Sequence, residues 1–414
     1  MHVVIVNAVF PPEPVISAKI GSDLASYLCD IGHKVTVLCP YPTRPISAKY
    51  REFSDRKKIF ISQLENGARV IRLPSFTSPK SNLLGRIYES WSFGYHVNRY
   101  LLKQLTDSDV VYANTWPFLS QWWLGKACEQ LQKPLFFHIQ DLYPESLLAR
   151  LPRWLAWALA PFLFWIERRI SQRASGTIVI SEGFREKYLT SRSLPENVVK
   201  TVINWLDDQP FKKNWNRQKS CLKYDVPPNK FTFLFFGNIG PVAGVELLIA
   251  AFDKANIKNA QLVIAGDGSI KDQCITMAKE TGNRSIQFIA DPDISAAPRI
   301  QSLADVCLLP VKKGQAVSSV PSKLMVYMVS GKPILTTVDE PSETASAIRE
   351  AESGWIGPPE NVNWLSDAMR NVACTSTSEL EAYGDRARSY ALKRYSRNVG
   401  VANVVDFITK NLEN

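Results

Sequence analysis

The feature that most constrains the fold is an alternation of strand-like and helix-like segments that occurs twice along the chain. In residues 1–205, short apolar runs typical of buried parallel strands are separated by longer segments with helical periodicity. After a polar stretch at 206–230, a second series of the same kind begins at Phe231. Strands that alternate with helices indicate βαβ units, in which helices cover both faces of a parallel sheet. The chain is therefore predicted to form two α/β domains.

The individual segments follow from apolar runs and from the turn residues that separate them. In the first series, strands are expected at Val3–Asn7, Val35–Cys39, Arg69–Leu73, Val110–Ala113, Leu135–Ile139, Gly176–Ile180 and Thr201–Ile203. Helices are expected near Ser17–Asp30, Asn82–Leu105 and Leu119–Gln132. In the second series, strands are expected at Phe231–Phe236, Gln261–Ala265, Ile286–Ile289, Val306–Pro310 and Pro333–Thr337. The chain is expected to end in helices near Trp364–Val372 and Leu380–Thr409.

Length, charge and cysteine content limit the class of protein. A chain of 414 residues exceeds one hydrophobic core and suits two or three domains. The net charge of +10 favours acidic ligands or an anionic surface. Nucleic acid is set aside because the basic residues are spread along the chain and no recognised binding module occurs. Seven scattered cysteines, with no C-x-x-C pair, predict reduced thiols, a cytoplasmic protein and no structural zinc.

An apolar run at Trp154–Ile166 is flanked by basic residues. Pro161 interrupts the run, and it is too short to cross a bilayer, which needs about 20 residues. Its tryptophans are typical of a segment that rests at a membrane interface, as are the flanking arginines Arg150, Arg153, Arg168 and Arg169. A helical hairpin buried in the first domain would explain the run as well. The N-terminal residues form a strand pattern and do not resemble a secretory signal.

The stretch Val317–Thr337 reads as a loop, a helix at Ser322–Val329 and a strand. Backbone N–H groups in the first turn of a helix have no partner within the helix, and the helix dipole is positive there. Lys323 adds a full charge at the same place, so the turn suits an anion such as a diphosphate. An ordinary corner, with Ser322 capping the helix and Lys323 in water, is the alternative.

Motifs along the chain resemble the retaining glycosyltransferases of family 4, the group 1 enzymes of polysaccharide assembly. Within that family the chain is most similar to the branch of capsule, colanic-acid and fucosamine transferases. The matching pieces lie in the family's order over nearly the whole chain. They are Phe10-Pro11-Pro12-Glu13, Gly32-His33-Lys34-Val35, His138-Ile139-Gln140-Asp141-Leu142-Tyr143-Pro144-Glu145, Val202-Ile203-Asn204, Phe236-Gly237-Asn238-Ile239-Gly240, Ile264-Ala265-Gly266-Asp267-Gly268, Pro321-Ser322-Lys323 and Gly331-Lys332-Pro333-Ile334.

The resemblance implies the GT-B fold, with two Rossmann-like domains facing across a cleft. Residues 1–205 would bind the acceptor, 206–230 would link the domains, and 231–385 would bind the nucleotide sugar. The helix at 386–414 would pack back on the first domain. The implied reaction moves a sugar from a UDP- or GDP-sugar to a glycan or an isoprenoid-diphosphate-linked acceptor. It would use no metal and no cofactor, in the cytoplasm at the inner face of the plasma membrane.

The resemblance also implies roles for individual residues. The catalytic candidates are His138, Asp141 and Glu145, and the acceptor-side candidates are Glu13 and Lys19. The donor-binding candidates are Gly237, Asn238, Gly240, Gly266, Gly268, Ser319, Val320, Ser322, Lys323 and Leu324. Each group has a plainer interpretation. His138 could be a structural residue, Asp141 and Glu145 could begin a surface helix, Glu13 could cap a turn, and the Gly266–Gly268 segment could be a tight turn.

The chain departs from the family pattern at several positions. The family's paired glutamates fall on Ser318 and Val326, and its basic pair falls on Asn238 and Ala243. Val15 and Ile16 stand where relatives carry two glycines, and Lys19 stands where arginine is common. Lys323 is then the one cation in the donor loop. Two alternatives therefore stay open: a nucleotide-sugar 2-epimerase of the same architecture, and a catalytically degenerate assembly partner.

Overall fold

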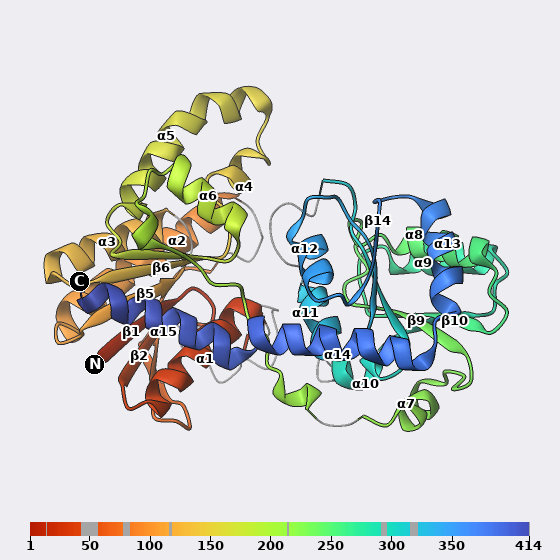
Figure 1. Ribbon diagram of the computed structural model, residues 1–414. Helices are drawn as coiled ribbons and strands as arrows, with labels where there is room; N and C mark the ends of the chain where they lie inside the picture. The colour runs from red at the N-terminus through yellow and green to blue at the C-terminus, as the bar shows by residue number, and fades with distance from the viewer. Residues whose placement is uncertain are drawn as a thin grey trace. The chain divides into compact units, whose positions relative to one another are not determined.

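The computed structural model describes residues 1–13, 15–42, 57–77, 83–115, 118–212, 215–290, 296–314 and 322–413. The chain divides into two compact α/β units (Figure 1). The first comprises Met1–Asn204 together with Gly400–Asn414, and the second comprises Trp205–Val399. Two separate α/β domains were expected from the alternating segments, and this prediction is confirmed.

The first unit contains an eight-stranded sheet in the order β3-β4-β2-β1-β5-β6-β7-β8. Its strands are β1 (His2–Asn7), β2 (Lys34–Pro40), β3 (Phe60–Gln63), β4 (Arg69–Leu73), β5 (Val110–Asn114), β6 (Leu135–Ile139), β7 (Gly176–Val179) and β8 (Val199–Thr201). All neighbours pair in parallel except β3 and β4, which are antiparallel. Sequence analysis missed β3 because its four residues are exposed and lack an alternating burial pattern.

Helices cover both faces of this sheet. They are α1 (Ile16–Asp30), α2 (Leu83–Gln104), α3 (Leu119–Leu131), α4 (Glu145–Leu148), α5 (Arg153–Ser171), α6 (Glu182–Thr190) and the part of α15 (Arg397–Glu413) that begins at Gly400. One face packs Phe137 and its neighbours against α2, α3 and α6. On the other face, Phe136 meets Phe407 of α15, with ring centroids 6.0 Å apart. The expected packing of the C-terminal helix on the first domain is confirmed, although Tyr395 and Ser396 divide the predicted long helix into α14 and α15.

The apolar run forms most of α5, a single 19-residue helix that contains Pro161. The buried hairpin considered from the sequence is therefore wrong. A proline removes one hydrogen bond from a helix, and the helix-forming leucines and alanines around Pro161 continue through it. The buried residues of α5 are Glu167, Ile170 and Ser171, all near its C-terminal end. The remainder of the helix, 153–166, contains no buried residue.

The second unit contains a six-stranded parallel sheet in the order β11-β10-β9-β12-β13-β14. Its strands are β9 (Phe231–Phe236), β10 (Ala260–Ala265), β11 (Ile286–Ile289), β12 (Val306–Pro310), β13 (Ile334–Thr337) and β14 (Gly354–Gly357). The hydrophobic core on one face includes α8 (Val245–Ala255), α9 (Lys271–Glu280) and α13 (Val362–Ala373). Figure 1 shows α11 (Ser322–Val329) and α12 (Glu343–Glu350) on the opposite face. This unit also contains α10 (Ala297–Gln301) and α14 (Thr377–Arg394), and Leu380 of α14 belongs to the core on the first face.

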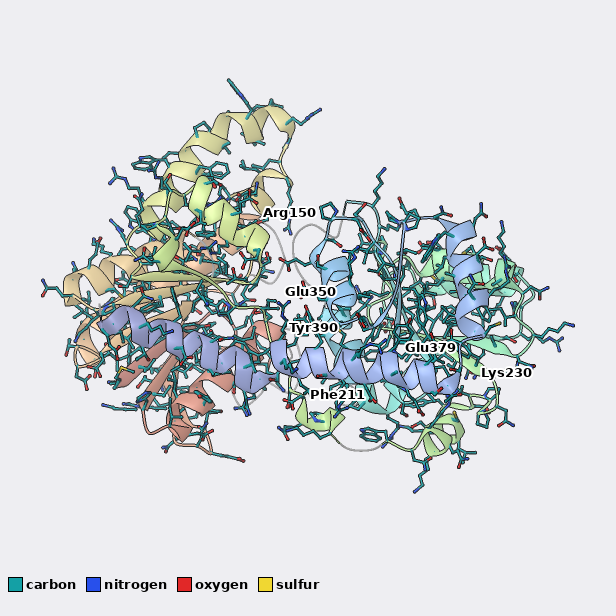
Figure 2. All side chains as sticks on the ribbon, viewed as in Figure 1. Arg150, Phe211, Lys230, Glu350, Glu379 and Tyr390 are labelled. Carbon is teal, nitrogen blue, oxygen red and sulfur yellow. The ribbon has the colours of Figure 1, made fainter. Side chains whose placement is uncertain are left out.

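Side chains on α14 tie this long helix to its own unit. The Tyr390 hydroxyl donates to Glu350 Oε2 of α12 over 3.0 Å (Figure 2). The Arg388 guanidinium donates to Val329 O, at the end of α11, and to Phe211 O. Gly384 lies so close to Gly331 that an added Cβ would stand 2.2 Å from the Gly331 carbonyl oxygen. The backbone of α14 therefore approaches the end of α11 without an intervening side chain.

The polar stretch expected to connect the domains is largely folded onto the second unit. It contains a short 3₁₀ turn at Gln209–Phe211 and the helix α7 (Arg217–Tyr224). Arg217 forms an ion pair with Asp305, with Nη2 2.8 Å from Asp305 Oδ2, and Asp305 also accepts from Thr232 N over 2.7 Å. Arg217 thereby fixes α7 beside the start of β9. The N-terminal segment of the first unit ends at Asn204.

Candidate functional site

The strand order of the second sheet reverses between β9 and β12. In doubly wound sheets, ligands bind outside the carboxyl ends of the strands at such a reversal, because the chain leaves the two adjacent strands toward opposite faces. The loop after β9 contains Gly237, Asn238 and Gly240, and the connection after β12 leads into α11 at Ser322. Topology alone therefore brings these predicted donor residues to one edge.

At this edge two glycine-containing loops pack backbone against backbone. Gly237 N donates to Ala265 O over 2.9 Å, and Ile239 N donates to Asp267 O over 2.8 Å. A Cβ on Gly266, where φ is +143°, would lie 2.0 Å from Gly237 O. A Cβ on Gly268 would lie 2.2 Å from Ile239 O. Both glycines are required by this close approach, so the Gly266–Gly268 segment supports the loop after β9 as well as forming a turn.

Lys323 lies over the end of β9. Its side chain crosses Gly237, where an added Cβ would stand 2.5 Å from Lys323 Cε. The ammonium nitrogen lies 4.2 Å from the centre of the Phe235 ring and donates to Asn238 O over 3.3 Å. Burial lowers the pKa of the Lys323 ammonium to about 8. Its charge is thus held beside the first turn of α11, where backbone N–H groups also favour an anion.

The sequence analysis assigned no role to Tyr327. Its buried hydroxyl accepts from Phe236 N over 2.9 Å and donates to Phe236 O over 3.1 Å. This pair of hydrogen bonds fixes α11 to the end of β9, and with it the position of Lys323 one turn earlier. A tyrosine within an otherwise apolar helix was the available signal, because a buried hydroxyl needs a polar partner.

The other predicted donor residues have different surroundings. Ser322 is exposed at the start of α11. The Leu324 side chain is buried, so its backbone amide in the first turn of α11 is the group it offers to a ligand. Gly240 is adjacent to the Asn238 side chain. A Cβ added to Gly240 would lie 3.0 Å from Asn238 Nδ2. Ser319 and Val320 lie outside the described residues, as does Ser318.

The first sheet has its own reversal, between β1 and β5. Asn7 and Asn114 end these strands in register, and Ala8 N donates to Asn114 O over 2.9 Å. The loop that follows β1 contains Glu13, which is buried. Arg72 of β4 anchors this loop through Pro11 O. The two predicted acceptor-side residues differ in exposure. Glu13 is buried near the reversal, whereas the Lys19 side chain is exposed on α1.

His138 lies near the end of β6 and is buried against β5. Its Nδ1 is 2.5 Å from the Tyr112 hydroxyl oxygen, and burial lowers the pKa of His138 to about 3. The ring is therefore neutral at physiological pH. The other ring nitrogen, Nε2, is buried and has no hydrogen-bond partner among the described residues. If the Tyr112 hydroxyl donates to Nδ1, then Nε2 carries a proton that a ligand could accept.

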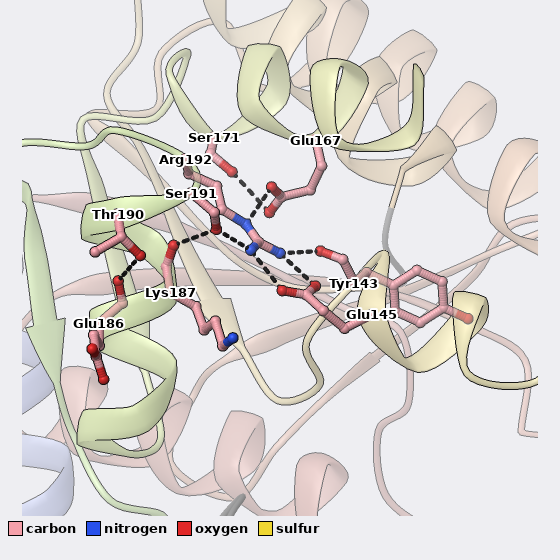
Figure 3. Close-up of polar contacts among 9 residues, drawn as sticks. All are labelled: Tyr143, Glu145, Glu167, Ser171, Glu186, Lys187, Thr190, Ser191 and Arg192. Atoms are coloured by element: carbon pink, nitrogen blue, oxygen red, sulfur yellow. Dashed lines mark hydrogen bonds and ion pairs between the residues drawn. The ribbon is translucent and has the colours of Figure 1, made fainter. Parts of the chain in front are cut away.

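The two predicted carboxylates near His138 differ in their surroundings. Asp141 is exposed in the turn after β6. Glu145 begins α4 and is held by Arg192 through two contacts of 2.7 Å (Figure 3). Burial opposes ionisation of Glu145, but the hydrogen bonds from Arg192 outweigh it and lower the pKa of the carboxyl group. A carboxylate so engaged is a poor proton acceptor, so the geometry favours Asp141 over Glu145 for general base chemistry.

Two sequence families match consecutive parts of the chain. "Glycosyltransferase Family 4" matches residues 22–209, and "Glycosyl transferases group 1" matches residues 216–390. The putative colanic acid biosynthesis glycosyl transferase WcaI of Escherichia coli K12 is 24% identical over 348 residues, which cover 81% of this chain and 83% of WcaI. The probable glycosyltransferase WbjE of Pseudomonas aeruginosa is 24% identical over 216 residues, covering 50% of this chain and 53% of WbjE.

Solved structures match the whole chain. A glycosyltransferase from Rickettsia africae ESF-5 superposes with a TM-score of 0.72 at 14% identity, covering 100% of this chain and 99% of that protein. Anabaena Alr3699/HepE, solved in complex with UDP and glucose, superposes with a TM-score of 0.67 at 15% identity, covering 99% and 100%. These similarities establish the GT-B fold that was expected from the sequence.

Proposed function

The chain belongs to the family 4 glycosyltransferases of the glycosyl transferase group 1 type, enzymes that transfer a sugar from a nucleotide sugar, and we propose the following details of its reaction. The donor is a UDP- or GDP-sugar, and the sugar keeps its anomeric configuration. The acceptor is a glycan or an isoprenoid-diphosphate-linked saccharide of surface polysaccharide synthesis. On this proposal the enzyme works in the cytoplasm at the inner face of the plasma membrane.

The observation that carries the donor site is the position of Lys323. Transfer breaks the bond between the anomeric carbon and a diphosphate oxygen, so negative charge develops on the leaving diphosphate. Lys323 Nζ and the first-turn amides of α11, including those of Ser322 and Leu324, supply positive charge at one place. Ser319 and Val320 would extend the same set of amides. The proposal relies on these groups, rather than on a metal ion, to neutralise the diphosphate.

The proposed acceptor side uses a neutral histidine and an exposed carboxylate. His138 Nε2, which lacks a partner among the described residues, hydrogen-bonds a hydroxyl of the transferred sugar. Asp141 accepts the proton of the acceptor hydroxyl or orients that hydroxyl. Glu13, in the loop after β1, contacts substrate, and Lys19 contributes charge from α1. Glu145 contributes indirectly through Arg192.

The proposed lipid-linked acceptor rests on α5. Trp154 and Trp157 are 72% and 82% exposed, and Phe162 and Trp165 are exposed as well. An apolar helix that the described residues leave exposed indicates a binding surface. The arginines near its ends, Arg153, Arg168 and Arg169, complement anionic lipid headgroups, and tryptophan favours the membrane interface. We therefore propose that α5 rests on the membrane that carries the acceptor.

None of the helices in the described part of the chain is both long and apolar enough to cross a membrane.

The donor site is tested by calorimetric titration of UDP- and GDP-sugars into the parent protein and into Lys323→Ala. One of the two donor classes is expected to bind the parent, and the variant is expected to bind at least about tenfold more weakly because a charge-assisted contact is lost. Lys279→Ala, at an exposed position of α9, is the matched control and should bind like the parent. Equal binding by Lys323→Ala would place the diphosphate elsewhere.

Turnover separates the proposal from its two alternatives. With the bound donor and a lipid-linked acceptor, a transferase lengthens the acceptor. A 2-epimerase would instead convert the nucleotide sugar without any acceptor. An assembly partner would bind donor and form neither product. Analysis of both the nucleotide sugar and the acceptor in one reaction therefore distinguishes the three functions.

A further inference from the structure

Arg192 lies at the meeting point of α4, α5 and α6 and is completely buried. All five of its N–H groups have acceptors (Figure 3). Nε donates to Glu167 Oε2 over 2.7 Å. Nη1 donates to Glu145 Oε1 and Ser191 Oγ, and Nη2 donates to Glu145 Oε2 and Tyr143 O, over 2.6 to 2.7 Å. We call these five residues the arginine cluster. No donor of the guanidinium remains for a ligand, so the cluster holds parts of the protein together.

One arm of the arginine cluster reaches α5. Glu167 is the point at which α5 passes from exposed to buried, since 153–166 contains no buried residue. Its carboxylate also accepts from the Ser171 hydroxyl over 3.2 Å. Phe164 of the same helix lies against the guanidinium, 5.2 Å from Arg192 Cζ to the ring centre. Arg192 thus contacts α5 at the base of its exposed aromatic part.

The other arm reaches the segment that follows His138. Glu145 and Tyr143 O belong to the turn and short helix directly after Asp141. Since α4 has four residues and none is buried, its own packing provides little to fix it. Leu142 packs against the hydrophobic core, and the Tyr143 ring meets Phe118 with ring centroids 5.4 Å apart. To these contacts the bidentate pairing of Glu145 with Arg192 and the hydrogen bond to Tyr143 O add charge-assisted constraints on the segment 141–149.

We propose that Arg192 is a positioning residue that couples α5 to the segment carrying Asp141. Because one rigid guanidinium holds both elements, a change in the order or tilt of α5 alters the constraint on 141–149, and the coupling is reciprocal. Its role in catalysis rests on the proposed docking of α5 on a lipid surface. Under that proposal, docking orders α5, and Arg192 transmits the order to the carboxylate next to the acceptor.

The coupling itself is tested without lipid, by amide hydrogen exchange of the full-length protein. Glu167→Gln removes the charge of the α5 arm while keeping the shape, and exchange at 141–149 is expected to become about tenfold faster. Glu145→Gln should in turn accelerate exchange in the last two turns of α5. Exchange in β1 and β5 should stay at the parent rate in both variants, which separates coupling from general destabilisation.

Glu129→Gln is the matched control, because Glu129 pairs with Arg173 over 3.1 Å near the same end of α5 but is half exposed. It should leave 141–149 unchanged. If Glu167→Gln leaves exchange at 141–149 at the parent rate, or accelerates β1 and β5 equally, the coupling is overturned.

The lipid step is tested with vesicles of phosphatidylcholine and phosphatidylglycerol. The parent is expected to float with the vesicles and to show slower exchange at 141–149 when bound. Glu167→Gln should float with the vesicles to the same extent as the parent, but vesicle binding should no longer slow its exchange at 141–149. A purely structural role of Glu167 would leave that slowing unchanged. A response of equal size in Glu167→Gln would overturn the coupling. A parent that does not float would overturn the docking of α5, and the lipid-free comparison would still decide the coupling.

Discussion

The carboxyl edges of the two sheets are built by different means. In the second unit, glycines and main-chain hydrogen bonds shape the edge, and Lys323 adds a charge there. In the first unit, buried polar side chains shape it, including the Tyr112–His138 pair and the arginine cluster. Main-chain N–H groups suit any diphosphate, whereas a buried side-chain network whose members are all satisfied holds the surrounding elements in one arrangement. Under the proposed function, we therefore expect generic diphosphate binding in the second unit and selectivity for the substrate in the first.

The largest expected effect comes from removing the centre of the side-chain network. Arg192→Ala leaves Glu145 and Glu167 without their charge partner, and breaking a buried ion pair costs about 3–5 kcal/mol. Urea unfolding of the first unit should report this loss. Glu129→Ala, which breaks the more exposed pair with Arg173, should cost about 1 kcal/mol or less. Similar losses for both variants would contradict a special role for the buried network.

The second prediction breaks the main-chain edge. Gly266→Ala places a methyl group 2.0 Å from Gly237 O, so the loop after β9 must move, at a cost of about 1–3 kcal/mol. Nucleotide-sugar affinity should fall with stability, because the displaced loop supports Lys323. Gly282→Ala is the control, since Gly282 also has a positive φ, +70°, but has nothing within 4 Å of its added Cβ. It should lose stability without losing affinity.

The third prediction uses the pKa of Lys323. Since burial lowers this pKa to about 8, the free enzyme loses the charge as the pH rises through that value. The diphosphate of a nucleotide sugar has no group that titrates there, so calorimetry should show affinity falling between about pH 7 and about pH 9, by up to about tenfold per unit. The stability of the folded protein is expected to respond to pH in the direction opposite to the affinity. The folded state releases this proton at a lower pH than the unfolded chain, so the contribution of Lys323 to stability rises over the same range.

Lys323→Met provides the comparison for the pH series. This variant should bind the nucleotide sugar more weakly than the parent, and its affinity should not change with pH in this range. A parent affinity that stays constant from about pH 7 to about pH 9 would mean that Lys323 does not contact the diphosphate.

The smallest expected effect concerns the histidine of the first unit. Tyr112→Phe removes the hydrogen bond to His138 Nδ1, which is worth about 0.5–1.5 kcal/mol. If His138 orients the transferred sugar, kcat should fall by about two- to tenfold while donor affinity remains at the parent value. A change in the affinity for the free nucleoside diphosphate would instead assign His138 to nucleotide binding.

The sequence predicted the elements better than their contacts. Buried strands such as Leu135–Ile139 and the helix Ser322–Val329 lie where apolar periodicity placed them. The continuity of α5 through Pro161 was not predicted, because local sequence does not show whether neighbouring residues sustain a helix. The partner of Glu145 was also hidden, since Arg192 lies 47 positions further along the chain. Charges so far apart are paired by the fold, and no spacing rule relates them.

The division of the first unit between both ends of the sequence has a consequence for biosynthesis. Phe407 closes over Phe136 and Gly176, so the hydrophobic surface around β6 and β7 stays open until translation reaches the last helix. A truncation shortly before Gly400 would therefore damage the unit that residues 1–204 mainly form.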